Sequence, residues 1–398
     1  MRMIESYSLI KAGIRIPKFR YYILSLFLVY SAISANQRSD PKYDSLITAG
    51  IKQIYNIKFN EAEETFALLR NEYPKQPAGV FFDAMIVWWM IMLDFDNLSY
   101  DDLFFEKIEE TIDFCDDLLD ENEENVDALF FKGGALGFRG RLYSVRKDWF
   151  NAALDGKEAL PLVYEAYEID PDNNDVQLGF GIYNYYAAVI PEKYPFVKPF
   201  MLFFPSGDRD KGLEQLKSAA EMGRYSKFES KYFLLHLFFH FENDYDKAMV
   251  YAEDLAEIFP DNPTFQRYFG RCYVGRGDYL SAFRVFDSMI EKCDRNLPGY
   301  SNWIKREAAY YVGMYYKNLG ETDSSMVYFT ISEKLSRVLD ADKEEESGFL
   351  INSVLYTGMI YLNRGEVEIA RSKFEELLEM RDYNNSRATA QAFLDKLK

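Results

Sequence analysis

The sequence contains few of the residues that build disulfide frameworks or imidazole-based sites. Its 398 residues include three cysteines and two histidines. Three cysteines cannot all pair within one chain, so the fold does not depend on disulfides. A Cys272–Cys293 bridge in an oxidising compartment remains an open alternative. With 22 Gly and 13 Pro, the chain also lacks the composition of collagen-like and low-complexity proteins.

Basic residues are outnumbered by acidic ones beyond the first 35 positions. Residues 1–35 carry five basic residues and one acidic residue, a net charge of +4. Because the whole chain has a charge of −18, the remaining 363 residues have a net charge of −22. Such a surface repels polyanions, and no concentrated basic run follows residue 35. The charge therefore excludes nucleic acid as the expected partner and disfavours attachment to anionic lipid through basic residues.

Long apolar runs are also few. Residues 21–35 form an apolar run of fifteen residues after a basic stretch, which predicts a signal peptide over 1–35, cleaved near Ala35, and a short linker over 36–42. We expect an exported protein, periplasmic or envelope-associated if bacterial, without bulk membrane insertion after signal removal. An uncleaved membrane anchor is the alternative. The second run, over 80–93, has polar flanks and predicts a buried helix.

Small and apolar residues recur in blocks that predict amphipathic helical hairpins. Residues 43–74 contain two such blocks with three- and four-residue spacing. The pattern returns in 264–293, 302–335 and 347–380. Ala248 and Ala282, which occupy the same place in two second helices, are 34 residues apart. This repetition predicts an all-α array of helix pairs.

Three sets of repeated residues carry a resemblance to a known family. They are small residues in the first helix (Gly50, Gly270, Gly313, Gly358), small residues in the second helix (Ala62, Ala248, Ala282, Ala370), and phenylalanines near the latter (Phe66, Phe286, Phe329, Phe374). With this pattern the chain resembles the tetratricopeptide repeat (TPR) superfamily. The resemblance implies an α-α superhelix, or solenoid, of about seven to eight helical hairpins.

The central units depart from the standard repeat. One carries about fourteen extra residues between its landmarks, and the next contains an insert, 190–207, with four prolines and many aromatics. Prolines disfavour a regular helix through the insert, and the aromatics predict that it folds back onto the helices. We expect N-terminal TPR-like repeats over 43–225, C-terminal repeats over 226–380 and a capping helix over 384–398.

The insert also carries a weaker, local resemblance. In residues 185–216, an apolar segment with prolines precedes a glycine-aspartate turn and a Gly-Leu-x-x-Leu helix. This stretch is similar to a segment of the eukaryotic tetratricopeptide-39 and inclusion-clearance proteins. The similarity implies a recurring variant of the helical repeat and transfers no activity.

No constellation of residues predicts chemistry. His236 and His240 are one helical turn apart, the spacing of two zinc ligands, but no third ligand lies nearby and a packed histidine explains His236 better. The glycines at 133, 134 and 137 are not followed by the Lys-Ser/Thr of a phosphate-binding loop. We therefore assign no catalytic, cofactor-binding or metal-binding residues, and we predict that the protein is not an enzyme and has no cofactor.

The remaining candidate is a surface. First helices line the concave side of such an array and typically receive an extended peptide or a partner helix. Counting from the small residue of each unit predicts a protein-binding groove lined by Arg267, Arg271, Tyr310, Met314, Lys317, Asn318, Asn352, Met359 and Asn363. Its cations and amides would suit an acidic segment of a protein or peptide partner.

The sequence thus predicts a non-enzymatic, exported scaffold of the cell envelope that mediates protein–protein interaction through its groove. The alternative is a helical small-ligand-binding protein or enzyme with a site under the insert 190–207. Tyr183, Tyr185, Tyr186 and Tyr194 lie near that insert, and aromatic clusters line many ligand pockets.

Overall fold

The computed structural model describes residues 40–198 and 205–397, and the predicted signal peptide lies outside the described residues. The chain divides into two compact units, Met1–Leu46 and Ile47–Lys398. In the first unit, the described residues include the first turns of helix α2 (Pro41–Tyr55). The second unit contains the remaining turns of α2 and all later helices, and the contacts below lie within it.

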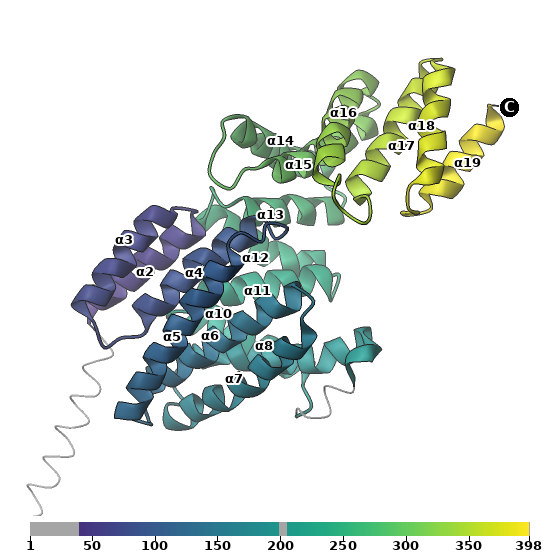
Figure 1. Cartoon of the computed structure of the whole chain (residues 1–398). Coiled ribbons are helices and arrows are strands. Elements are labelled where there is room, and N and C mark those ends of the chain that lie inside the picture. Colours follow the sequence, from purple (N-terminus) through teal and green to yellow (C-terminus); the bar gives the residue numbers. More distant parts are fainter. Residues whose placement is uncertain (1–39, 199–204, 398) are drawn as a thin grey trace, which may run out of the picture. The chain divides into compact units, whose positions relative to one another are not determined.

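The described residues form seventeen α-helices and one short 3₁₀ helix, in a series of consecutive hairpins (Figure 1). After α2 the helices are α3 (Phe59–Glu72), α4 (Ala78–Leu93), α5 (Asp101–Glu121), α6 (Val126–Val145), α7 (Trp149–Ile169), α8 (Val176–Lys193), η1 (Pro195–Val197), α10 (Arg209–Met222), α11 (Lys227–His240), α12 (Tyr245–Ile258), α13 (Pro263–Gly275), α14 (Tyr279–Asp294), α15 (Asn302–Leu319), α16 (Thr322–Leu339), α17 (Gly348–Asn363), α18 (Val367–Glu379) and α19 (Ser386–Lys396). Eight helix pairs, α2/α3 to α17/α18, precede α19. The predicted all-α, TPR-like array of seven to eight hairpins is confirmed.

Each standard hairpin closes by packing a phenylalanine of its second helix against a glycine of its first. A Cβ atom at Gly270 would lie 2.7 Å from the Phe286 ring, and one at Gly313 would lie 2.9 Å from Phe329. Both phenylalanines are fully buried. A larger residue at either glycine would separate the two helices, which explains the recurrence of small residues at these positions.

The extra residues of the third hairpin lengthen its helices. Helices α6 and α7 have 20 and 21 residues. Gly133 and Gly140 of α6 both face α7, at Val163 and Asp155 respectively. The added turns therefore extend the hairpin contact and introduce no separate loop.

The proline-rich insert begins inside a helix. Helix α8 continues through Pro191 and ends at Lys193, because that proline lies in the last turn and removes only one helical hydrogen bond. Residues 199–204 lie outside the described part of the chain. Beyond them the chain returns to α8: the Tyr183 hydroxyl donates to the Pro205 carbonyl, and Gly207 lies against Ala188.

The apolar run over 80–93 forms the buried helix α4. Thirteen of its 16 residues are buried, among them Trp88 and Trp89. No helix among the described residues is both long and apolar enough to cross a membrane.

Hairpins that are distant in sequence also pack against each other. Trp89 of α4 contacts Tyr232 of α11 and Phe265 of α13, with ring centroids 5.9 Å and 5.5 Å apart. The Lys343 ammonium lies 2.6 Å from Asp96, which is 247 positions earlier. The structure therefore differs from an open solenoid, in which each repeat contacts only its neighbours.

Candidate functional site

The structure places Arg267 and Arg271 together on one face of α13, where they share the carboxylate of Glu307 on α15. The Arg267 Nε and Nη2 atoms donate to Glu307 Oε2 at 3.0 Å and 2.9 Å. Arg271 Nη2 donates to the same oxygen at 2.8 Å. Arg267 also lies over the Trp303 ring, 3.8 Å from its centroid. Two guanidinium groups thus compensate one buried carboxylate.

Burial and pairing act in opposite directions on these three groups. The Glu307 side chain is 1% exposed, and this burial raises its pKa, but the two guanidiniums outweigh the effect and the pKa is lowered. Burial lowers the pKa of Arg267, whereas for Arg271 the attraction of Glu307 outweighs burial and raises the pKa. All three groups therefore carry their charges at neutral pH, and the cluster has an excess of one positive charge.

The other predicted groove residues lie on α15 and α17. The Asn352 amide donates to the Tyr310 hydroxyl at 3.2 Å, and the Lys317 ammonium lies 4.9 Å from the centroid of the Tyr356 ring. The side chains of Lys317, Asn318 and Asn363 are exposed, and those of Met314 and Met359 are half-buried. Arg267, by contrast, is buried and engaged with Glu307, so it is not a free cation on an inner wall. The predicted groove as a binding surface stays a prediction.

A second arginine–glutamate pair lies between α6 and α11. Arg141 Nη1 donates to Glu229 Oε1 at 3.0 Å, and the other oxygen accepts from the Tyr55 hydroxyl at 2.8 Å. The Arg141 guanidinium also covers the rings of Trp88 and Phe233, 4.9 Å and 4.6 Å from their centroids. Aromatic faces and a carboxylate hold this cation in one position.

Between these two pairs lie the two histidines. Their ring centroids are 4.7 Å apart, and His240 Nε2 lies 2.9 Å from the Tyr268 hydroxyl. Burial, together with His240 and Arg141, lowers the pKa of His236 to about 3. Burial, together with Arg271, lowers the pKa of His240 to about 4. Both rings are therefore neutral at pH 7.

We call this group of side chains the central seam and define it by Arg141, His236, His240, Tyr268 and Arg271. Its members come from α6, α11 and α13, and its two arginine side chains are 23% and 20% exposed. The seam brings together two guanidinium groups, two neutral imidazoles and a phenol, and both guanidinium groups already donate to carboxylates of the chain.

Sequence reasoning found Arg271 but missed Arg141. A usable signal was present: Arg141 follows Gly140 as Arg271 follows Gly270, and both glycines pack against the second helix of their own hairpin. In the long third unit, counting first-helix positions from Gly140 would have placed Arg141 on the face that corresponds to that of Arg271.

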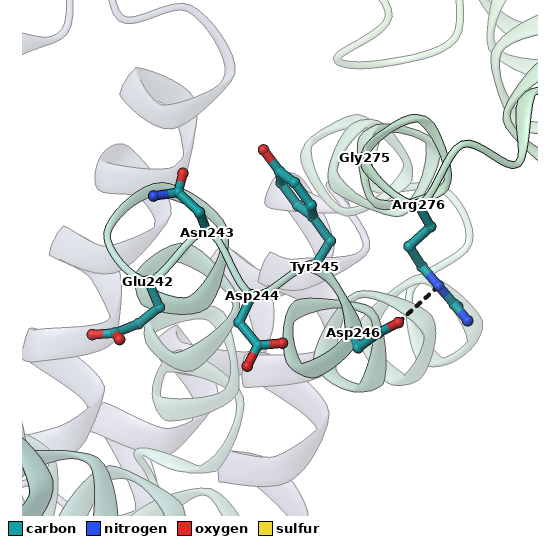
Figure 2. A pocket seen from close by; sticks show the side chains of 7 residues that line it. All are labelled: Glu242, Asn243, Asp244, Tyr245, Asp246, Gly275 and Arg276. Atoms are coloured by element: carbon teal, nitrogen blue, oxygen red, sulfur yellow. Dashed lines mark ion pairs between the residues drawn. The ribbon is translucent and has the colours of Figure 1, made fainter.

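An open hollow lies at the turn between α11 and α12 (Figure 2). It is lined by Glu242, Asn243, Asp244, Tyr245, Asp246, Gly275 and Arg276. Its acids already have partners: hydrogen bonds from Arg209 lower the pKa of Glu242, those from Lys247 lower the pKa of Asp244, and Asp246 pairs with Arg276 at 3.0 Å. The hollow therefore offers little free charge to a ligand.

The tyrosines of the alternative ligand site are occupied by intramolecular contacts or exposed. The hydroxyl of Tyr183 is bonded to Pro205, and that of Tyr185 to Glu242. Tyr186 packs edge-on against Phe241. Tyr194 is exposed at the end of α8.

No group of three or more metal-ligating side chains occurs among the described residues. The three cysteines are free and buried, so the alternative Cys272–Cys293 bridge is not formed. Burial raises the pKa of Cys272 to about 12 and that of Cys293 to about 11, which leaves both as unreactive thiols at neutral pH.

No protein-family model matches the sequence, and neither does a curated protein. Similar solved structures include yeast Tom70 (13% identity, 96% of this chain and 93% of that chain, TM-score 0.37) and human IFIT1, solved as a dimer with m7Gppp-AAAA (12%, 90% and 86%, 0.41). Another is the C-terminal part of a TPR repeat-containing protein from Cytophaga hutchinsonii (15%, 77% and 98%, 0.35). These likenesses concern the fold alone. The glycine–phenylalanine packing of this chain's own hairpins gives it a tetratricopeptide-like fold.

Proposed function

We propose that the protein is a non-enzymatic scaffold, exported to the cell envelope, that binds an acidic segment of a protein partner at the central seam. The observation that carries this proposal is the sharing of Glu307 by Arg267 and Arg271. One of the two positive charges lacks its own carboxylate, and Arg271 is the more exposed of the pair. A carboxylate of the partner would supply the missing countercharge.

The location of the seam supports the same partner chemistry. Residues 36–398 carry −22, so most of the surface repels an acidic peptide. The seam combines Arg141 and Arg271 with two histidines that are neutral at pH 7 and add no charge of either sign. An acidic segment is therefore attracted to the seam and repelled by the acidic part of the surface, so charge helps to direct where the segment binds.

The test uses a defined probe, a fluorescein-labelled peptide of alternating Glu and Ser with a free carboxyl terminus. We expect it to bind residues 36–398 in fluorescence polarisation, with an affinity that falls as salt is raised. A peptide with Lys in place of Glu should not bind. The substitution Arg271→Gln keeps most of the side-chain volume and should weaken binding by about tenfold.

A matched control lies on the same helix end. Arg276 is exposed and pairs with Asp246 outside the seam, so Arg276→Gln should leave the peptide affinity unchanged. An equal loss of peptide affinity in the two variants would show that binding depends only on the net charge of the chain, and it would overturn the proposed site. Absence of binding to the parent chain would reject acidic peptides as the partner class.

Export is tested separately. If residues 1–35 are a signal peptide, the protein recovered from the envelope fraction begins near residue 36. A protein that retains Met1 in that fraction would support the uncleaved anchor, and one that retains it in the cytoplasm would reject export.

A further inference from the structure

A second surface, which shares no residue with the seam, lies where α7 begins and α8 ends. Trp149, Phe150 and Leu154 project from the first turns of α7, and Tyr194 and Phe196 follow the last turn of α8. Phe150 is 65% exposed and Phe196 61%. The ring of Phe196 lies 6.5 Å from that of Trp149 and 6.2 Å from that of Tyr194, so the two groups are continuous. We call these five residues the aromatic patch.

The patch is exposed because α8 packs mainly against α10 and covers only the far part of α7. The contacts between α7 and α8 gather around Phe180, whose ring lies 4.8 Å from that of Tyr164. At the other end, none of residues 149–154 is buried. In a standard hairpin the corresponding second helix buries residues such as Ala282 and Phe286 within its first two turns. Five large apolar side chains therefore stand in water at one end of a hairpin, which a monomeric soluble protein rarely tolerates without a use.

The charge around the patch is opposite in sign to that of the chain. Residues 145–160 and 190–198 contain four exposed lysines, Lys147, Lys157, Lys193 and Lys198, and two exposed carboxylates, Glu158 and Glu192. Of the lysines, Lys193 is engaged, because its ammonium donates to the His240 carbonyl at 3.2 Å. The other two acids in these ranges are engaged: Asp148 caps α7, and Asp155 is buried against Arg139. The acidic chain thus presents one end that is both apolar and positively charged.

We propose that the aromatic patch docks on the surface of an anionic lipid bilayer. Tryptophan and tyrosine favour the boundary between head groups and acyl chains, phenylalanine and leucine favour the acyl side, and lysine favours the anionic head groups. All three kinds of residue occur here within residues 147–157 and 194–198. The net charge of the chain disfavours contact with an anionic bilayer, but the charge is unevenly distributed. The bilayer repels the acidic part of the surface, so the chain would meet it with the aromatic patch.

The first test is flotation of residues 36–398 with vesicles. This chain contains every helix described above, and the contacts of the patch lie within it. We expect binding to vesicles of equal parts phosphatidylcholine and phosphatidylglycerol, weaker binding at high salt, and little binding to phosphatidylcholine alone. The double substitution Trp149→Ser with Phe196→Ser should reduce the bound fraction more than tenfold.

The control replaces apolar residues that are equally exposed elsewhere. Val250 on α12 and Val338 on α16 are exposed and lie outside the patch. Val250→Ser with Val338→Ser should leave vesicle binding unchanged, and circular dichroism should show the same helix content in all three proteins. Substituting Lys147→Glu with Lys198→Glu should lower binding to the anionic vesicles without removing an aromatic side chain.

Three outcomes would overturn the proposal: no binding of the parent chain to anionic vesicles, equal binding by the patch variant, or binding that ignores the lysine substitutions. Analytical ultracentrifugation, which measures the oligomeric state, distinguishes binding to a bilayer from binding to a second copy of the chain. If the parent chain is a dimer without affinity for vesicles and the patch variant is a monomer, the patch binds a second copy of the chain. Because none of the patch residues belongs to the central seam, these results and those for the acidic peptide are independent.

Discussion

The hydroxyl of Tyr55 donates a hydrogen bond of 2.8 Å to the carboxylate of Glu229, although 174 positions separate the two residues. The same tyrosine accepts a bond of 2.9 Å at its main-chain oxygen from the amide of Asn262. Helix α2 of the first hairpin therefore meets the fifth and sixth hairpins directly. These contacts convert a row of local units into a structure stabilised by long-range polar bonds.

The first prediction concerns this hydrogen bond. The substitution Tyr55→Phe removes the hydroxyl and leaves Glu229, which is buried, with Arg141 as its remaining partner. Loss of a buried hydrogen bond to a charged group should lower the free energy of unfolding by about 1–3 kcal/mol. Urea unfolding followed by circular dichroism measures the change.

The control for Tyr55 is Tyr164, whose side chain is exposed on α7. Tyr164→Phe should change the free energy of unfolding by less than about 0.5 kcal/mol. Equal effects of the two substitutions would show that the bond to Glu229 adds nothing to stability.

The second prediction concerns the glycines of the first helices. A Cβ at Gly270 would lie 2.7 Å from Phe286, so Gly270→Ala should destabilise the protein by about 1–3 kcal/mol. Gly137 of α6 has nothing within 4 Å of its Cβ position. There the same substitution should stabilise by about 0.5–1 kcal/mol, because alanine restricts the unfolded chain and favours the helix. Thermal unfolding of both variants should therefore shift in opposite directions.

The third prediction concerns Glu307. The substitution Glu307→Gln leaves Arg267 and Arg271 without a carboxylate and should cost about 3–5 kcal/mol at neutral pH. Because pairing lowers the pKa of Glu307 in the folded state, its contribution is present above the unfolded pKa and is lost as the pH falls through the folded pKa. The difference between parent and variant should accordingly shrink below about pH 4. A constant difference over this range would show that the carboxylate charge is not responsible.

The fourth prediction concerns acid stability. The pKa of His236 is about 3 in the folded state, below its ordinary value of 6.5, so the unfolded chain binds more protons in between. Stability should therefore decline as the pH falls from about 6.5, and His236→Gln should flatten that decline. Unfolding in urea at several pH values measures both slopes. Identical slopes in parent and variant would place the acid sensitivity in other groups.

The hairpins could be predicted from the sequence because their determinants are local. Gly313 and Phe329 belong to one hairpin, and each standard hairpin repeats the same helix-to-helix contact. The contact of Trp89 with Phe265 could not be predicted, because it depends on small rotations that accumulate over several hairpins. The sequence of the two contacting segments does not contain the sum of those rotations, so it cannot indicate that they meet.

The candidate site was predictable only in part for the same reason. The count along the first helix put Arg267 and Arg271 on one face, but their shared partner Glu307 lies in the next hairpin, so neither is an unpaired cation. Arg141 meets Glu229 through a contact between the third and fifth hairpins, which no repeat spacing indicates. A charge pattern identifies the face of a helix, whereas the freedom of each charge depends on the neighbouring hairpins.

The last prediction decides between the central seam and the groove predicted from sequence. Arg271 belongs to the seam, whereas Lys317 is exposed and lies beside Tyr356 on the later hairpins. If the acidic peptide binds at the seam, Arg271→Gln should weaken it about tenfold and Lys317→Glu by less than about twofold, because a reversed charge outside the contact acts only through screened, long-range repulsion. Fluorescence polarisation at two salt concentrations measures both effects. An equal loss at Lys317 that persists at high salt would instead extend the binding surface along α15 to the groove that the sequence predicted.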